Sequence, residues 1–98
     1  MKQSIYCAII GDINNSRQLA DRVKVQRKFQ KAIDSVNAEH CRDIASKFTI
    51  TQGDEAQGLL ISAANSYRIV RRFQDIMGHV PFAFGIGIGK VSTLLNPK

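Results

Sequence analysis

The sequence is poor in the residues that build covalent frameworks or metal–thiolate sites. It has two cysteines, two histidines and no tryptophan among 98 residues. Cys7 lies in an apolar run and Cys41 beside charged residues, a spacing that fits neither a zinc site nor a disulfide framework. We expect both thiols to be reduced and structural, and we expect His40 and His79 at helix ends or loops and not as metal ligands.

Long apolar runs are also missing. No segment approaches the ~20 apolar residues of a membrane span, and the start, MKQSIYCAII, lacks the cleavage site of a secretory signal. These absences predict a cytoplasmic protein with no membrane partner. A chain with 44% hydrophobic residues and no linker, repeat or low-complexity segment predicts one domain over residues 1–98.

Acidic residues are scarce beside basic ones. Fourteen Lys and Arg stand against eight Asp and Glu, which gives a formal charge of +6, and between Arg17 and Lys31 only Asp21 opposes the basic residues. This excess favours an anionic partner, although a solvated helix face explains the same cluster.

The apolar periodicity predicts six elements. They are a strand at 4–12, a helix at 18–39, strands at 45–51 and 55–61, a helix at 63–77 that ends near Gly78, and a strand after Pro81. The order β-α-β-β-α-β predicts an α+β, ferredoxin-like fold, in which a four-stranded antiparallel sheet carries two helices on one face and leaves the other face open.

The last predicted strand, FAFGIGIG, separates its two faces sharply. Alternation places its large apolar side chains on the helix side and its glycines on the open side; the two sets are Phe84, Ile86 and Ile88, and Gly85, Gly87 and Gly89. Glycines weaken a strand, so a row of them indicates close approach of a ligand or another chain, or else a strong twist or bulge.

Acidic residues mark the ends of two strands that this fold makes neighbours. Asp12 ends the first strand, and Asp54 and Glu55 lie at the hairpin tip before the third. We expect Asp12 and Asp54 to converge. Converging carboxylates repel one another unless a cation neutralises them, and Mg²⁺ or Mn²⁺ does so with water and phosphate oxygens completing the shell. An ordinary turn also explains Asp54.

A short polar loop, INNSR, leads from Asp12 into the first helix. Backbone N–H groups before a helix suit a phosphate, which makes Asn14, Asn15, Ser16 and Arg17 candidate phosphate-binding residues. Helix capping explains the first three equally well. Ser16 has no partner histidine in the pattern, so a nucleophilic triad has no support.

Three blocks of the sequence, IIGDINNSR, ITQGDEAQGLL and FGIGIGKVST, resemble the SatD family over essentially the whole chain. More distantly they resemble the palm-type core of class III nucleotide cyclases and GGDEF diguanylate cyclases. The resemblance implies metal binding by Asp12, Asp54, Glu55 and the carbonyl of Ile13. It implies phosphate or nucleotide binding by the 14–17 loop with Gly53, Gly85 and Gly87.

The sequence also departs from the cyclase pattern. Ile50 stands where those enzymes place a purine-reading lysine, and Ala56 stands where the GGDEF signature has phenylalanine. Their transition-state Asn and Arg come from beyond the fourth strand. We therefore expect no cyclase reaction from this chain by itself, and we expect it to lack a C-terminal region that resembles a winged helix in the family.

Three functions remain as hypotheses. The first is a metal-dependent nucleotide-binding domain. The second is a non-catalytic regulatory or dimerisation module of a DNA-binding regulator, forming a homodimer through the open face around Tyr6, Ala8 and Ile10. The third, an RNA-binding sheet, is disfavoured because the third strand, AQGLLIS, has no aromatic residue and the first has only Tyr6.

Overall fold

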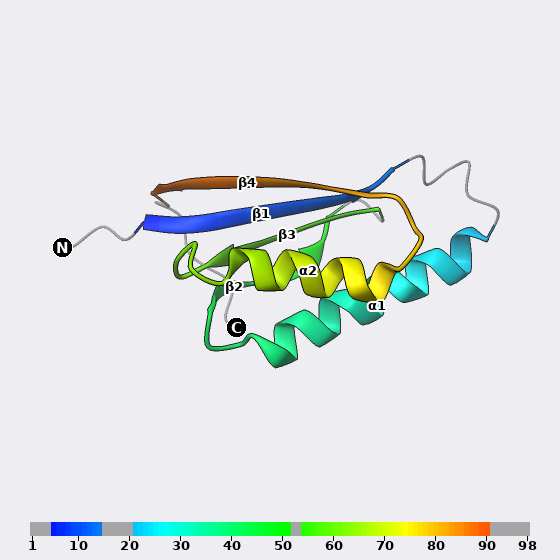
Figure 1. Ribbon diagram of the computed structural model, residues 1–98, viewed down its shortest axis with the longest axis horizontal. Coiled ribbons are helices and arrows are strands. Elements are labelled where there is room, and N and C mark those ends of the chain that lie inside the picture. The colour runs from blue at the N-terminus through cyan, green and yellow to red at the C-terminus, as the bar shows by residue number, and fades with distance from the viewer. Residues whose placement is uncertain (1–4, 15–20, 52–53, 91–98) are drawn as a thin grey trace.

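The computed structural model describes residues 5–14, 21–51 and 54–90. In chain order its elements are β1 (Ile5–Ile13), α1 (Arg22–Glu39), β2 (Ile44–Ile50), β3 (Glu55–Leu60), α2 (Ser66–Met77) and β4 (Phe82–Lys90). The strands form one antiparallel sheet in the order β2-β3-β1-β4, with both helices on one side of it (Figure 1). The predicted α+β fold with the β-α-β-β-α-β order is confirmed.

The core lies between the helices and the sheet face that they cover. α1 buries four of the five apolar side chains that its periodicity predicts, Phe29, Ala32, Ile33 and Val36. The fifth, Val25, is only partly buried. From α2, Phe73 places its ring centroid 6.1 Å from that of Phe82 and 6.0 Å from that of Phe84. These contacts pack the first half of β4 against α2, since aromatic pairs at such distances stabilise a fold beyond the burial of their surface.

The helix ends correct two predicted boundaries. The Asp21 side chain accepts a hydrogen bond from the Lys24 N–H at 3.1 Å, so α1 begins after this cap and not at residue 18. α2 begins at Ser66 and not at residue 63. Tyr67, which the periodicity assigns to the apolar face of α2, is 73% exposed, so that prediction is wrong. Gly78 ends α2 with a φ of 61°, the C-cap that the sequence predicts.

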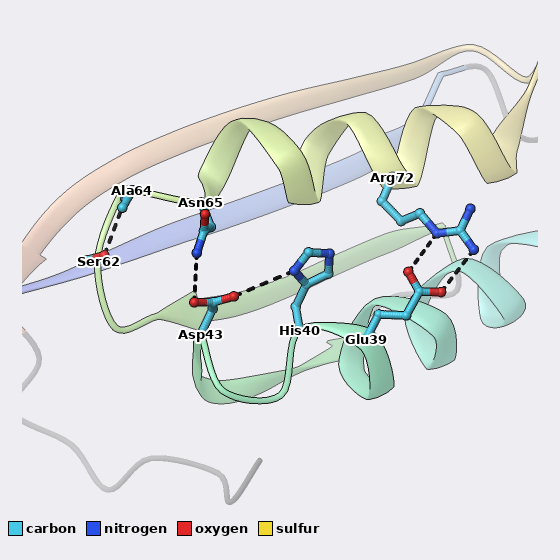
Figure 2. Close-up of polar contacts among 7 residues, drawn as sticks. All are labelled: Glu39, His40, Asp43, Ser62, Ala64, Asn65 and Arg72. Carbon is cyan, nitrogen blue, oxygen red and sulfur yellow. Dashed lines mark hydrogen bonds and ion pairs between the residues drawn. The ribbon is translucent and has the colours of Figure 1, made fainter.

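Polar contacts link the end of α1 and the turn after it to α2 and its N-cap residue, Asn65 (Figure 2). Arg72 donates from Nε and Nη2 to the two carboxylate oxygens of Glu39, both at 2.9 Å. This hydrogen bond lowers the pKa of Glu39. Asp43 accepts a 2.8 Å bond from the Asn65 amide, and its other oxygen lies 3.6 Å from Nδ1 of His40, the C-cap residue of α1. The expectation of a helix-end role for His40 is confirmed.

Both cysteines are free, but the structural role expected of both fits only Cys7, because Cys41 is exposed. Cys7 is part of the core, and its burial raises the pKa of its thiol, because an apolar surrounding disfavours the thiolate. Cys41 is exposed in the turn after α1. Neither helix of the described chain combines the length and apolar content that a membrane crossing needs.

Candidate metal and phosphate site

The register between β1 and β3 brings the predicted acids to one end of the sheet. The Ile13 N–H donates to the Asp54 carbonyl at 2.9 Å, which makes these two residues a hydrogen-bonded pair. The next pair along, Asp12 with Glu55, is therefore a non-hydrogen-bonded pair, in which facing side chains lie closer together. The carboxylate directly across from Asp12 on the open face belongs to Glu55, one residue beyond the predicted Asp54.

Two like charges in a facing pair destabilise a sheet unless something compensates them. The exposed Asp12 side chain lies on the open face of β1, while Glu55 is half-buried. The Thr51 hydroxyl lies 3.3 Å from Oε1 of Glu55, and the Thr51 N–H donates to the Glu55 carbonyl at 2.8 Å. Thr51 is not among the predicted site residues, and its position just before the hairpin is the only signal in the sequence that marks it.

The predicted phosphate-binding residues are only partly within the described chain. Asn15, Ser16, Arg17 and Gly53 lie outside it. The exposed Asn14 directly follows β1, and its N–H donates to the carbonyl of Pro81 at 3.0 Å. This bond extends the pairing of β1 with the start of β4, so Asn14 lies beside the same end of the sheet as Asp12.

The β4 glycines contrast with two glycines of the core. A Cβ built at Gly85 or Gly87 would meet no described atom within 4 Å, whereas one at Gly11 would lie 2.5 Å from the Phe82 ring. One at Gly58 would lie 2.7 Å from the Phe48 ring. Packing within the described chain therefore explains Gly11 and Gly58, but it does not explain the absence of side chains on the open face of β4.

The helix side of β4 corrects another expectation. Ile86 and Ile88 pair with Ile9 and Cys7 and share their side of the sheet, as the alternation predicts. Their burial does not follow: Ile86 is 53% and Ile88 67% exposed. Ile5 on β1, which alternation along the strand places on the same side as Cys7 and Ile9, is 57% exposed. The helices cover the sheet only as far as Phe82 and Phe84 along β4.

The donor set at the acidic end suits a cation that shares its shell with water and phosphate. Among residues 5–14, 21–51 and 54–90, no three His, Cys, Asp or Glu side chains are grouped closely enough to form a protein-only metal cage. Mg²⁺ does not need one, because one or two carboxylates with waters and substrate phosphates complete its octahedron. Asp12 and Glu55 are such a pair of carboxylates, with Asp54 next to them in the chain.

A cavity lies elsewhere, between α1 and β2. Its volume is about 360 Å³, and its lining includes Gln30, Asp34, Asn37 and Lys47. None of the predicted metal or phosphate residues lines it. The acidic end of the sheet is therefore separate from this cavity.

Comparisons with known proteins identify the family. Neither a curated protein nor a solved structure gives a significant match to this chain. The profile of the SatD family matches residues 6–98, which include both acidic segments and the glycine-rich strand. On this match the chain belongs to the SatD family.

Proposed function

We propose that this domain binds a divalent cation, Mg²⁺ or Mn²⁺, together with the phosphate groups of a nucleotide-type ligand. The observation that carries the proposal is the facing pair of Asp12 and Glu55 on the open face of the sheet. Facing carboxylates gain from a cation between them, and the net charge of +6 favours an anionic ligand.

Three groups of residues have distinct roles in this proposal. One or two of the carboxylates of Asp12, Asp54 and Glu55 hold the cation, with the Ile13 carbonyl as a further oxygen and water and phosphate completing the shell. The segment from Asn14 to Arg17 contributes backbone and side-chain donors to phosphate oxygens, and the bare face at Gly85 and Gly87 leaves room for the rest of the ligand. The bound cation neutralises phosphate charge.

The test is a thermal-shift titration with Mn²⁺ and a nucleoside triphosphate. A ligand that binds only the native state raises the melting temperature. We expect a shift for the wild type that Asp12→Asn and Asp54→Asn abolish, while Asp34→Asn, on the exposed face of α1, keeps it. Equal shifts in all four proteins would refute the site. Glu55→Gln should reduce the shift as well, because Glu55 faces Asp12.

The proposed phosphate contacts are tested separately, with a lysine on α1 as the control. A hydrogen bond to a charged partner contributes about 1.5–3 kcal/mol, so Arg17→Ala should weaken triphosphate binding by about that amount. Lys28→Ala, on α1, should change it little. Equal losses in the two variants would instead indicate diffuse attraction to a basic surface.

A second candidate function is a regulatory module without turnover that forms a homodimer through the open face. Tyr6, Ala8 and Ile10 lie on that face, and Ile10 is 44% exposed. A contact there would remove apolar surface from water. Light scattering on the wild type and on Tyr6→Glu tests this candidate, because a dimer that tolerates the new charge does not use the open face.

A further inference from the structure

The outer edge of β4 presents a regular row of backbone hydrogen-bonding groups. The Asn14 N–H bonds to the Pro81 carbonyl, and the register from there pairs Asp12 with Ala83 and Ile10 with Gly85. Odd-numbered β4 residues therefore bond to β1, since antiparallel strands alternate bonded and non-bonded pairs. The N–H and C=O groups of the even-numbered residues point outward; these residues are Phe82, Phe84, Ile86, Ile88 and Lys90.

No hydrogen bond joins these outward groups to another residue within the described ranges. The strand is nine residues long, and its register against β1 runs without a shift from Ile5–Lys90 to Ile13–Phe82. Natural sheets block such edges with bulges, prolines or charges along the strand. β4 has one charged residue, Lys90, at its last position.

The same edge strand carries two large exposed apolar side chains. Ile86 and Ile88 stand on the helix side, beyond the part of β4 that Phe73 contacts. On the other side Gly85 and Gly87 offer no side chain that would hinder an approaching strand. A pairing partner would thus gain backbone bonds and apolar contacts from one strand.

We infer that β4 pairs with β4 of a second copy of this chain, antiparallel about a two-fold axis that passes beside Ile86. Because only even-numbered residues present outward groups, the bonded pairs must join even residues to even residues. Centring the axis on Ile86 uses the whole strand: Ile86 faces its own copy, Phe84 faces Ile88, and Phe82 faces Lys90.

This arrangement favours a second copy because the strand is complementary to itself. Side chains of facing residues lie on the same side of a sheet, so Ile88 meets the Phe84 of its partner and the two Ile86 side chains meet at the axis. Lys90 faces Phe82, so no like charges oppose one another. One strand pair is smaller than the standard interface of about 1,600 Å², and we therefore expect a weak dimer with a micromolar Kd.

The test exploits the residue that faces itself. Light scattering and sedimentation across a concentration series should show a monomer–dimer equilibrium for the wild type. Ile86→Lys and Ile86→Glu should each weaken it at least tenfold, because equal charges then face one another, and an equimolar mixture should restore dimers. Since Ile86 is half exposed, circular dichroism should confirm that both variants fold.

Matched controls separate this contact from others. Val23 on α1 is 60% exposed, so Val23→Lys and Val23→Glu add the same charges elsewhere and should leave the equilibrium unchanged. Tyr6→Glu, on the open face, should also leave it unchanged. A wild-type monomer at high micromolar concentration would overturn the inference, and so would an Ile86→Lys dimer of undiminished affinity.

Discussion

The two edges of the sheet are built differently. At β2 the Asn37 side chain, from α1, donates to the Phe48 carbonyl at 3.0 Å and accepts from the Phe48 N–H at 2.8 Å, so a side-chain amide takes the place of a neighbouring strand. β2 also shifts register twice against β3. β4 has neither device: its register is continuous, and no described residue bonds its outward groups. One edge is blocked at Phe48 by the fold itself, and the other is left available for pairing.

The comparison extends to the glycines beside each edge. We expect Gly58→Ala, next to β2, to destabilise the protein by about 1–3 kcal/mol, the usual cost of overpacking a core. The new methyl group would lie 2.7 Å from the Phe48 ring. Gly87→Ala should change the monomer by less than about 0.5 kcal/mol, because its methyl group enters open space. Urea unfolding of both variants measures the difference, and similar losses would contradict it.

Opening the closed edge should have the next largest effect. Asn37→Ala removes both bonds to the part-buried Phe48 backbone. The cost of leaving these groups unsatisfied is about 1–3 kcal/mol, reduced where water replaces the amide. Urea unfolding should therefore show a clear loss of stability. As a control, Gln30→Ala removes a side-chain bond to Asp34 on the exposed face of α1 and should cost much less. Equal losses would show that Asn37 does not close this edge.

Relief of the facing acids should have a smaller and opposite effect. Without a metal ion, Asp12→Asn should stabilise the protein by roughly 0.2–1 kcal/mol, because it removes one charge from the pair with Glu55. Adding salt to the wild type should stabilise it in the same direction, since ions screen exposed charges. A destabilised variant would mean that Asp12 is already paired in the apo protein.

The smallest effect concerns the contact between the helices. Arg72 holds the pKa of Glu39 below its ordinary value of 4.5, so this contact stabilises the protein above that pH and loses its effect as the pH falls through the lowered value. Glu39→Gln should therefore lower the melting temperature slightly at neutral pH, and the difference from the wild type should shrink under acid conditions. A difference that stays constant with pH would contradict this linkage.

The sequence predicts the architecture well because periodicity and turn residues are local signals. The buried face of α1 and the Gly78 cap follow directly from such signals. The register between β1 and β3 does not follow from local signals. A shift of one residue moves every side chain to the other face, so the pattern alone could not show that Glu55, and not Asp54, faces Asp12.

The sequence pattern also did not predict which strand residues the helices cover. Alternation assigns Ile86 and Ile88 to the helix side, but whether α2 reaches them depends on how it packs. From the sequence, Asn37 is an ordinary polar residue of α1. Its hydrogen-bond partner Phe48 lies eleven positions further along the chain, so no local pattern predicts the contact. For residues of an edge strand, the sequence therefore predicts the side of the sheet on which a side chain lies but not how exposed that side chain is.

Hydrogen exchange of individual backbone amides measures the difference between the β2 and β4 edges. In a monomer the amides of Gly85 and Gly87, bonded to β1, should be protected, while those of Phe84, Ile86 and Ile88 exchange quickly. Raising the protein concentration should protect these three amides as β4 strands pair, while the Phe48 amide stays protected at every concentration. Fast exchange of the Ile86 amide at all concentrations would contradict the pairing of β4, and fast exchange at Phe48 would contradict the closed edge of β2.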